Sequence, residues 1–409
     1  MNPSIIKKKD TSFDQCLKCT ICTVYCPVAQ VNPSYPGPKQ CGPDGERLRI
    51  KSPDFFDETL KYCTNCKRCE VACPSGVKIG DLIAVARDNQ GSLPKNPKLV
   101  RDFILSHTDL MGSVATPIAP IVNYMTDLKP VKYLMDKTIG VSGHKSLPKY
   151  SHGTFVGWFR KNKMKVKQAA FPRQVHYFHG CYVNYNNPEL GKDFVKVMNA
   201  MGIGVQIFDK EKCCGVPLIA SGFHEKARKN ALTNIDNFEK ATQKLDVPIL
   251  STSATCAMTL QQEYPHVLKV DNSKVVDKIE YITSWLLKAF MSGDMPKLKT
   301  MNLKVAYQTS CHMEVTGNRL FTIELMKMIP GVKVVEIDSQ CCGSAGTYCF
   351  KNENYEASEK IGAQLFTNIL DADVDIVVTD CETCKWQVEE HTQMETMHPI
   401  TLLARALAE

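Results

Sequence analysis

The chain has 409 residues, 44% of them hydrophobic and 23% charged, which is enough for two to four folded domains. The formal net charge of +7 is mild and is spread in small groups such as Lys7–Lys9. No base-reading motif accompanies this charge, so nucleic-acid binding is excluded from the expected functions.

The nineteen cysteines are far more than packing requires. The N-terminal lysines are not followed by the apolar segment of a signal peptide, so we expect a reducing compartment, where disulfides are rare. No apolar run of about 18 residues is present, so no transmembrane helix is expected. In this setting cysteines are metal ligands or redox groups.

Residues 1–90 are expected to form a small helical domain organised by cofactors. Two copies of C-x2-C-x2-C-x3-C-P occur in it, the run of bacterial ferredoxins, in which the fourth cysteine binds the other cluster. We therefore expect two cubane [4Fe–4S] clusters, a bis-[4Fe–4S] ferredoxin-like domain. The first cubane is assigned Cys16, Cys19, Cys22 and Cys73, and the second is assigned Cys63, Cys66, Cys69 and Cys26.

A pair of zinc sites is the alternative, because the C-x2-C spacing by itself is also compatible with zinc binding. The doubled motif, with a proline after each fourth cysteine, favours cubanes. The motifs are separated by a long insertion. Cys41 lies in this insertion, outside the ligand spacing, and is expected to be a packing or idle thiol.

Residues 91–170 contain no cysteine and mix prolines with amphipathic stretches. The apolar spacing predicts broken helices over Pro97–Met111 and Ile118–Met135. This segment is a candidate for docking on a membrane or a partner, with Lys129, Lys132 and Lys137 meeting anionic headgroups. Packing on its own protein or on partner subunits is the alternative.

Residues 171–409 contain an internal repeat. Cys181 and Cys311 are separated by 130 positions, and the Cys-Cys-Gly triplets that begin at Cys213 and Cys341 are separated by 128. Strands are predicted at 174–178, 205–208 and 247–250, and again at 304–308, 333–337 and 375–378. Helices are predicted between them at 188–201 and 319–329. This order predicts two tandem α/β domains with parallel sheets, over residues 171–295 and 296–409, with the cysteines at strand ends.

The second repeat has a complete set of thiols that can converge on one further cluster: Cys311, Cys341, Cys342, Cys381 and Cys384. The glycine after the cysteine pair is expected to let the backbone approach a bulky cofactor. Structural cysteines, a redox disulfide and a zinc site are the alternatives. Cys349 fits no ligand position.

The first repeat has Cys181, Cys213, Cys214 and Cys256, but Ser253 stands where the pattern requires a cysteine. A cluster with an altered ligand set and a vestigial or otherwise occupied site both remain open. His176, His179 and His312 lie near the repeat cysteines in sequence and are expected to pack or to orient ligands rather than to bind metal.

Two ferredoxin motifs followed by two Cys-Cys-Gly (CCG) domains resemble the iron–sulfur subunits of membrane-associated respiratory dehydrogenases and the heterodisulfide reductases. The resemblance implies a non-cubane [4Fe–4S] cluster on the complete repeat and leaves a second one open on the degenerate repeat. Four segments resemble, more narrowly, the C subunits of bacterial anaerobic glycerol-3-phosphate dehydrogenases: Pro36–Gln40, Gly42–Arg47, Lys61–Pro74 and Arg101–Gly112.

That family resemblance implies an electron-transfer subunit rather than the dehydrogenase itself. Flavin-containing subunits A and B would oxidise sn-glycerol 3-phosphate, and this chain would pass the electrons to menaquinone or ubiquinone at the cytoplasmic face of the inner membrane. No G-x-G-x-x-G fingerprint follows a strand, which agrees with this division. The alternatives are a heterodisulfide-reductase-like thiol–disulfide enzyme and the iron–sulfur subunit of a glycolate or lactate dehydrogenase.

Overall fold

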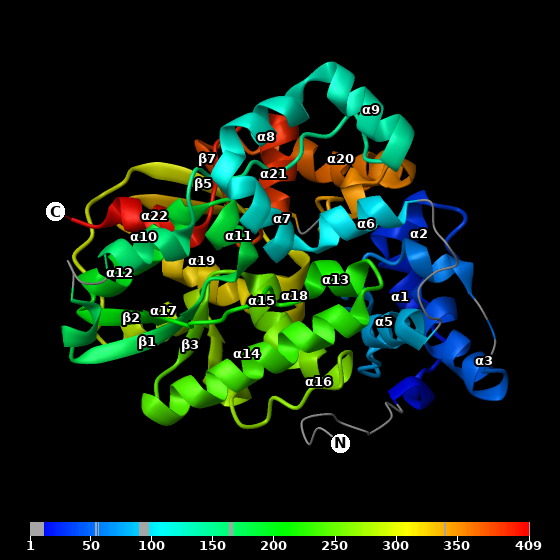
Figure 1. Ribbon diagram of the computed structural model, residues 1–409, viewed down its shortest axis with the longest axis horizontal. Coiled ribbons are helices and arrows are strands. Elements are labelled where there is room, and N and C mark those ends of the chain that lie inside the picture. The colour runs from blue at the N-terminus through cyan, green and yellow to red at the C-terminus, as the bar shows by residue number, and fades with distance from the viewer. Residues whose placement is uncertain are drawn as a thin grey trace.

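Two parallel four-stranded sheets form the frame of the second half of the chain (Figure 1). The computed structural model describes residues 12–53, 55, 57–89, 98–162, 167–338 and 341–408. The first sheet has the order β2-β1-β3-β4 and the second the order β6-β5-β7-β8, with every pair parallel. This identical order confirms the predicted duplication of an α/β unit.

The predicted strands are all present. In the first unit they are β1 (Arg173–Phe178), β2 (Ile203–Ile207) and β3 (Ile249–Ser251), and in the second β5 (Leu303–Gln308), β6 (Val332–Glu336) and β7 (Ile376–Thr379). Each sheet also gains a fourth strand that the sequence pattern did not predict. These strands are β4 (Ile279–Tyr281) and β8 (Thr396–Met397), which are too short to show an alternating pattern.

Four amphipathic helices fill the space between the two sheets and share one core with them. These helices are α12 (Pro188–Ala200), α17 (Ile282–Met291), α19 (Arg319–Lys327) and α22 (Pro399–Ala406). The packing pairs are α12 with α22 and α17 with α19, so each unit contributes one helix to each pair. The buried apolar side chains of this layer hold the two units face to face.

Further helices cover the outer faces of the sheets and carry the cysteine loops. The long ones are α14 (His224–Lys244), α20 (Tyr355–Asp371) and α21 (Glu382–Thr392). The short ones are α11 (Gly180–Tyr185), α13 (Val216–Ala220), α15 (Ala254–Met258), α16 (Tyr264–His266) and α18 (Cys311–Thr316), with π-helical turn η6 at Thr259–Glu263 and single turns η7 at Val276–Lys278, η8 at Tyr348–Phe350 and η9 at Asn352–Asn354.

The N-terminal module consists of short helices around the two ferredoxin-type motifs, at the blue end of Figure 1. Its elements are η1 (Ser12–Gln15), α1 (Ile21–Val24), α2 (Pro27–Val31), η2 (Gln40–Asp44), α3 (Gly45–Lys51), η3 (Glu58–Tyr62), α4 (Arg68–Val71) and α5 (Ile79–Asn89). Its small core packs Val28, Leu60, Val77 and Ile83 against cysteines. Ile361 of α20 joins this core, so the module rests directly on the second α/β unit.

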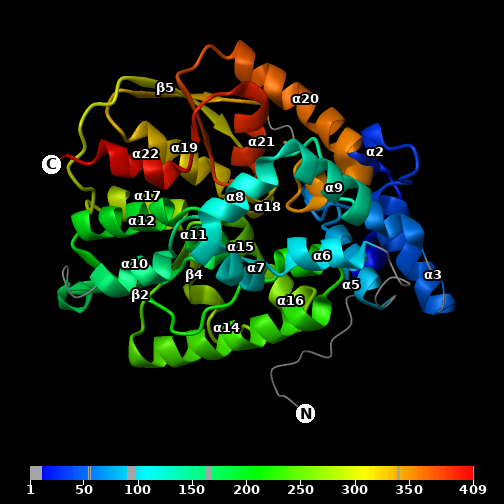
Figure 2. The same ribbon diagram turned by 45° about the horizontal axis from the view of Figure 1, so that its top comes forward.

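The cysteine-free segment forms a band of helices that lies over both units (Figures 1 and 2). The helices are α6 (Leu99–Ser106), α7 (Thr108–Ala115), η4 (Thr116–Ile118), α8 (Ala119–Asp127), α9 (Lys129–Ile139) and α10 (Phe155–Asn162), followed by the turn η5 (Gln168–Ala170). Helices predicted over 97–111 and 118–135 are confirmed where the structure describes them; Pro97 lies outside the described residues. Among the helices of the described chain, none is both long and apolar enough to cross a bilayer.

Candidate iron–sulfur sites

Eight of the nine cysteines of the N-terminal module gather in two groups of four, and Cys41 is the ninth. The thiol of Cys22 is close enough to those of Cys16, Cys19 and Cys73 for their charges to raise its pKa, although burial is the larger cause. The thiol of Cys69 is likewise influenced by Cys66, Cys63 and Cys26. Each group therefore contains three cysteines of one motif and the fourth of the other, as the sequence predicts. The ligand roles themselves belong to the proposal below.

The complete repeat brings its five cysteines to the carboxyl ends of its strands. Cys342 and Cys384 have their sulfur atoms 3.0 Å apart, and Cys381 lies directly after β7 at the start of α21. Burial raises the pKa of Cys311 well above its ordinary value, and the neighbouring thiols of Cys66 and Cys341 raise it further. The second group of the N-terminal module is therefore close enough to the cysteines of the complete repeat for the charges of their thiols to interact.

The degenerate repeat repeats this geometry with four thiols. The sulfur atoms of Cys214 and Cys256 are 3.4 Å apart, the counterpart of the Cys342–Cys384 pair. Ser253 takes the position of Cys381 and accepts a 3.3 Å hydrogen bond from the backbone N–H of Cys256, which caps α15. This residue therefore has a structural role of its own.

One apolar cavity of about 120 Å³ separates the two repeat sets. Sequence reasoning treated the repeats as separate sites, and the cavity shows that they face each other. Thiols from three places in the chain line it: Cys66 of the N-terminal module, Cys181, Cys213, Cys214 and Cys256 of the first repeat, and Cys311, Cys341, Cys342, Cys381 and Cys384 of the second.

The glycines after the cysteine pairs have a packing role besides the approach to a cofactor that is expected from the sequence. Gly215 and Gly343 have φ of 106° and 79°, in the left-handed region. A Cβ on Gly343 would lie 2.1 Å from the carbonyl oxygen of Ser358, and a Cβ on Gly215 would lie 3.3 Å from the Cβ of Ala227. Each glycine is therefore required for close packing on α20 or α14, in addition to any approach to a cofactor.

A buried polar network joins the second ferredoxin-type loop to both repeats. The side-chain amide of Asn65 donates a 2.7 Å hydrogen bond to Glu263, and the buried Lys67 pairs with Glu263 at 3.4 Å and with Asp81. His312 donates from Nε2 to the carbonyl of Asn65 at 3.3 Å and accepts at Nδ1 from Thr255 at 2.9 Å. His312 thus bridges three loops that carry cysteines and is held by protein contacts.

Two buried carboxylates support the loops of the first repeat. Asp109 of α7 accepts a 2.8 Å hydrogen bond from the backbone N–H of Cys213. Burial, followed by the nearby Cys213, raises the pKa of Asp109 to about 7. Glu211 accepts from the N–H groups of Gly180 and His179 at 2.7 and 3.3 Å, beside Cys181. The other histidine near these cysteines in sequence, His176, packs on Phe208 and bonds the carbonyl of Leu245.

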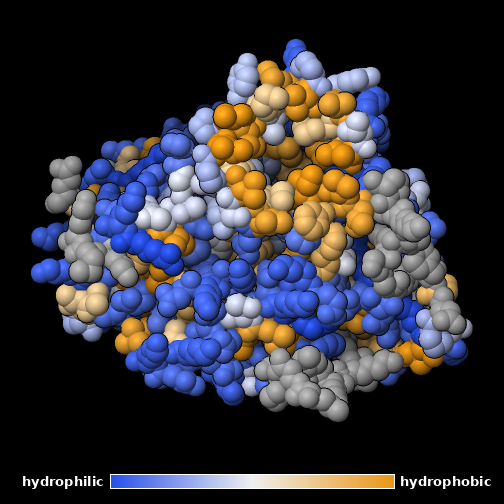
Figure 3. Space-filling view, viewed as in Figure 1, coloured by the Kyte–Doolittle hydropathy of each residue, from blue (hydrophilic) through white to orange (hydrophobic). Residues whose placement is uncertain are grey.

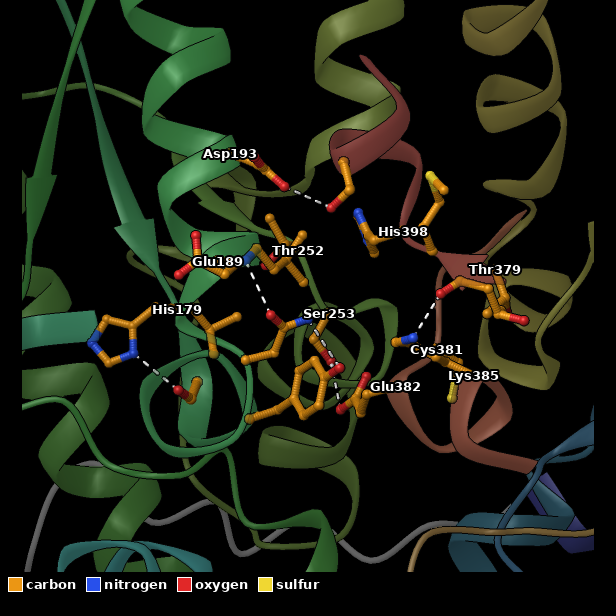
Figure 4. A pocket seen from close by; sticks show the side chains of 18 of the residues that line it. His179, Glu189, Asp193, Thr252, Ser253, Thr379, Cys381, Glu382, Lys385 and His398 are labelled. Atoms are coloured by element: carbon orange, nitrogen blue, oxygen red, sulfur yellow. Dashed lines mark hydrogen bonds between the residues drawn. The ribbon is translucent and has the colours of Figure 1, made fainter. Parts of the chain in front are cut away.

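A second cavity, of about 210 Å³, lies between the two units next to the same cysteines (Figure 4). Cys181, Cys256 and Cys381 reach its wall. Ser253 of the first unit and Glu382 of the second meet across it through a 3.4 Å hydrogen bond. The site therefore places thiols beside a second cavity whose wall also carries charged and hydroxyl side chains.

The donor set fits iron–sulfur clusters. Soft thiolates with an apolar surround are the ligands that such clusters require. Among the described residues, no three Cys, His, Asp or Glu side chains converge closely enough to hold a single metal ion. Burial raises the pKa of Cys26 to about 12. Hydrogen bonds with Cys342 and Cys381, followed by burial, raise the pKa of Cys384 well above its ordinary value, so metal binding must displace protons.

Two family profiles match the chain in the places where these cysteines lie. A 4Fe-4S dicluster domain matches residues 12–77, and a cysteine-rich domain matches residues 175–261 and 305–389. The C subunit of the anaerobic glycerol-3-phosphate dehydrogenase of Escherichia coli strain K12 is 57% identical over 399 residues, which cover 98% of this chain and 100% of that protein. The chain belongs to the family of anaerobic glycerol-3-phosphate dehydrogenase C subunits.

More distant relatives share the layout of this family. The glycolate oxidase iron-sulfur subunit of E. coli strain K12 is 24% identical, covering 97% of this chain and 95% of its own length. The D subunit of a dihydromethanophenazine:CoB–CoM heterodisulfide reductase from Methanosarcina barkeri is 23% identical, covering 94% and 91%. These are the two alternatives weighed from the sequence, and both are far less similar than the E. coli glycerol-3-phosphate dehydrogenase protein.

Several residues that shape the sites were not predicted. Asp109 lies in the segment without cysteines, and Glu211 and Glu263 lie outside the cysteine motifs. Asn65 and Lys67 are between the ligand positions of the second motif, and both have left-handed backbone conformations, with φ of 54° and 56°. A polar pair between closely spaced cysteines is the signal that sequence reasoning could have used.

Proposed function

We propose that this protein transfers electrons from flavin-containing partner subunits A and B, which oxidise sn-glycerol 3-phosphate, to a membrane quinone. The supporting observation is the continuous series of thiol groups. The first group of the N-terminal module is followed by the second, and Cys66 of the second reaches the cavity that both repeats share. As a member of a family of C subunits, the chain has partner subunits.

The ligands follow from these groups. Cys16, Cys19, Cys22 and Cys73 would hold one [4Fe–4S] cubane, and Cys63, Cys66, Cys69 and Cys26 the other. Cys311, Cys341, Cys342, Cys381 and Cys384 would hold a non-cubane [4Fe–4S] cluster, and Cys181, Cys213, Cys214 and Cys256 are the candidate ligands of a second. When bound, these clusters supply one-electron redox chemistry.

The residues around the thiols contribute insulation and positioning. The apolar wall of the shared cavity excludes water and lowers the local dielectric constant. The network of Asn65, Glu263 and His312 fixes the second ferredoxin-type loop against both repeats.

The helices α6–α9 are the proposed membrane surface, which we name the α6–α9 face. Its exposed apolar side chains are Leu99, Val100, Phe103, Ile104, Leu110, Val114, Ile118, Ile121, Tyr124, Met125, Tyr133 and Leu134. Figure 3 shows apolar residues gathered over the region where these helices lie. So large an apolar area is typical of an interaction site. Lys129 and Lys137 are exposed beside it and suit anionic headgroups.

This face lies directly over the first repeat. Asp109 of α7 bonds Cys213, and Gly112 of the same helix packs so closely on Tyr185 of α11 that a Cβ would lie 2.3 Å from the ring. A quinone that reaches the chain from the membrane would therefore meet the repeat sites first. This arrangement supports electron delivery at the repeat end of the series.

The function is tested by reconstituting the chain with its flavin subunits and quinone-containing vesicles. Cys341→Ser is expected to abolish quinone reduction by glycerol 3-phosphate while the flavin subunits still reduce an artificial dye. Quinone reduction at the wild-type rate in this variant would contradict the proposal.

The membrane surface has its own test by vesicle flotation with anionic lipid. Ile121→Asp and Tyr124→Asp are each expected to weaken binding about tenfold or more, because each removes an exposed apolar side chain that the lipid would bury. Leu370→Asp, an exposed apolar position on α20, is the matched control. Equal binding of all three variants would contradict a role of the α6–α9 face.

A further inference from the structure

The two ferredoxin-type loops have the same backbone conformation. Lys18 and Asn65 occupy the same place in their motifs, with φ of 58° and 54°, and Thr20 and Lys67 do so with φ of 63° and 56°. Each loop then enters a one-turn helix, α1 or α4, and these helices contact each other. The loops are therefore equivalent in shape, and residues at equal positions can be compared directly.

The second loop is covered by the repeat units, whereas the first loop is exposed. In the second loop Asn65 is 6% and Lys67 1% exposed, because the repeat units lie against them. Thr64 lines the cavity that holds the repeat cysteines. In the first loop the residue equivalent to Thr64 is Leu17, which is 72% exposed, and Lys18 and Thr20 are exposed as well.

The uncovered loop is apolar where its counterpart is polar. The exposed side chains around it form a surface that we name the Leu17 patch: Leu17, Ile21, Val24, Tyr25 and Val71. Cys19 lies between Leu17 and Ile21 in the sequence. All nineteen cysteines lie in the described part of the chain, and Cys19 is the one that is exposed. Exposed apolar side chains beside a redox ligand indicate a surface that is covered by another protein in the working complex.

We propose that the Leu17 patch is the docking surface for the subunit that donates electrons, a protein that presents a flavin near its surface. This inference rests on the proposed function. On the second loop this same face contacts the next thiol set along the series. On the first loop the equivalent face is exposed. An electron donor bound there would lie as near to Cys16, Cys19 and Cys22 as the repeat units lie to Cys66.

The location separates the two interactions of the chain. The Leu17 patch belongs to the N-terminal module at the right of Figure 1, whereas α8 and α9 of the α6–α9 face lie at the top, with α7 and α6 below them. A partner on the patch leaves the α6–α9 face free for the membrane. The donor and the quinone would then bind at opposite ends of the series of thiol groups.

The experiment uses the full chain purified with its clusters, with Leu17→Asp and Val24→Asp as separate variants. Binding to the flavin subunits is measured by co-purification and titration, and reduction of the chain by glycerol 3-phosphate is followed by the bleaching of cluster absorbance. Each variant is expected to bind about tenfold to a hundredfold more weakly, since a carboxylate replaces an exposed apolar side chain that the partner would bury. Met291→Asp, exposed on α17, is the matched control and is expected to bind as wild type.

A photo-crosslinking residue at Val24 gives a readout that does not depend on activity. The expected result is a covalent product with a flavin subunit, whereas the same residue at Met291 gives none. Wild-type binding by both aspartate variants, or no product from position 24, would overturn the docking surface. If the wild-type chain itself is not reduced by flavin subunits and substrate, the proposed function fails instead, so the two failures are distinguishable.

Discussion

Asn65 and Glu263, which are 198 positions apart in the sequence, are joined by a 2.7 Å hydrogen bond in the interior of the molecule. Asn65 lies between two cysteines of the second ferredoxin-type loop, and Glu263 belongs to the first α/β unit. The bond therefore ties a loop of the N-terminal module to a repeat unit at the place where their thiols approach one another. Glu263 is fully buried and depends on this donor and on Lys67 to compensate its charge.

We expect Asn65→Gly to lower the free energy of unfolding by about 1–3 kcal/mol, because a buried carboxylate loses a donor. Lys18→Gly is the control, since it also introduces a glycine, at the equivalent backbone position of the exposed loop. Glycine accepts the left-handed conformation at both sites, so the difference between the variants in chemical denaturation reports the side-chain contact. Equal stabilities would contradict the role of Asn65.

Asp109→Ala is expected to leave the buried N–H of Cys213 without its acceptor, which costs about 1–3 kcal/mol of unfolding free energy. Because Asp109 also anchors α7, hydrogen exchange should rise in Thr108–Ala115. Asp109→Asn keeps an oxygen that can accept the bond and is expected to stay near wild type. If Asn and Ala variants behave alike, the hydrogen bond is not what holds α7 to the first repeat.

Arg101 and Glu353 anchor α6 to the second unit through two hydrogen bonds of 2.8 and 3.1 Å. Burial alone would raise the pKa of Glu353, but the hydrogen bonds from Arg101, from its own backbone N–H and from Lys98 together outweigh burial and lower the pKa to about 2. The stabilisation is thus complete above the ordinary value of 4.5 and is lost as the pH falls towards 2.

Glu353→Gln is therefore expected to cost about 1–2 kcal/mol, a figure reduced for the partial exposure of the carboxylate. The cost should be constant from about pH 5 to 8, as measured by denaturation at each pH, because Glu353 stays ionised there. A stability difference that closes between pH 8 and pH 5 would contradict this ion pair.

Ser253→Ala is expected to lower stability by about 0.5–2 kcal/mol through the loss of the cap of α15. Its iron content should be unchanged, because Ser253 Oγ already accepts the N–H of Cys256. Cys384→Ser, which removes a proposed ligand, is the comparison and is expected to lose iron. A loss of iron in Ser253→Ala would make the serine a cluster ligand.

The local pattern of the sequence predicted the strands, among them the six-residue β1 and β5, although burial in the structure increases along these two strands instead of alternating. It did not predict β4 and β8, which have three and two residues and exist through pairing with β3 and β7. The grouping of Cys26 with Cys63, Cys66 and Cys69 followed from motif spacing alone. Contacts between distant segments, such as Cys213 with Asp109, leave no periodic signal and need the tertiary structure.

The face-to-face position of the two repeats was also beyond sequence reasoning. Duplication predicted two similar units, but the cavity that joins Cys256 to Cys381 depends on how α12 packs on α22 and α17 on α19. These pairings are set by the apolar faces of four helices together. Ser253 illustrates the same limit, because its role as a cap is visible only when the start of α15 is known.

Iron and acid-labile sulfide per chain, measured on protein purified without oxygen, test the central claim most directly. About twelve iron atoms are expected for two cubanes and one cluster on the complete repeat, or about sixteen if the first repeat is also filled. Cys342→Ser should lose about four of them, whereas Cys41→Ser, at a buried thiol outside the ligand spacing, should lose none. About eight iron atoms in the wild-type chain, with no loss in Cys342→Ser, would contradict the account.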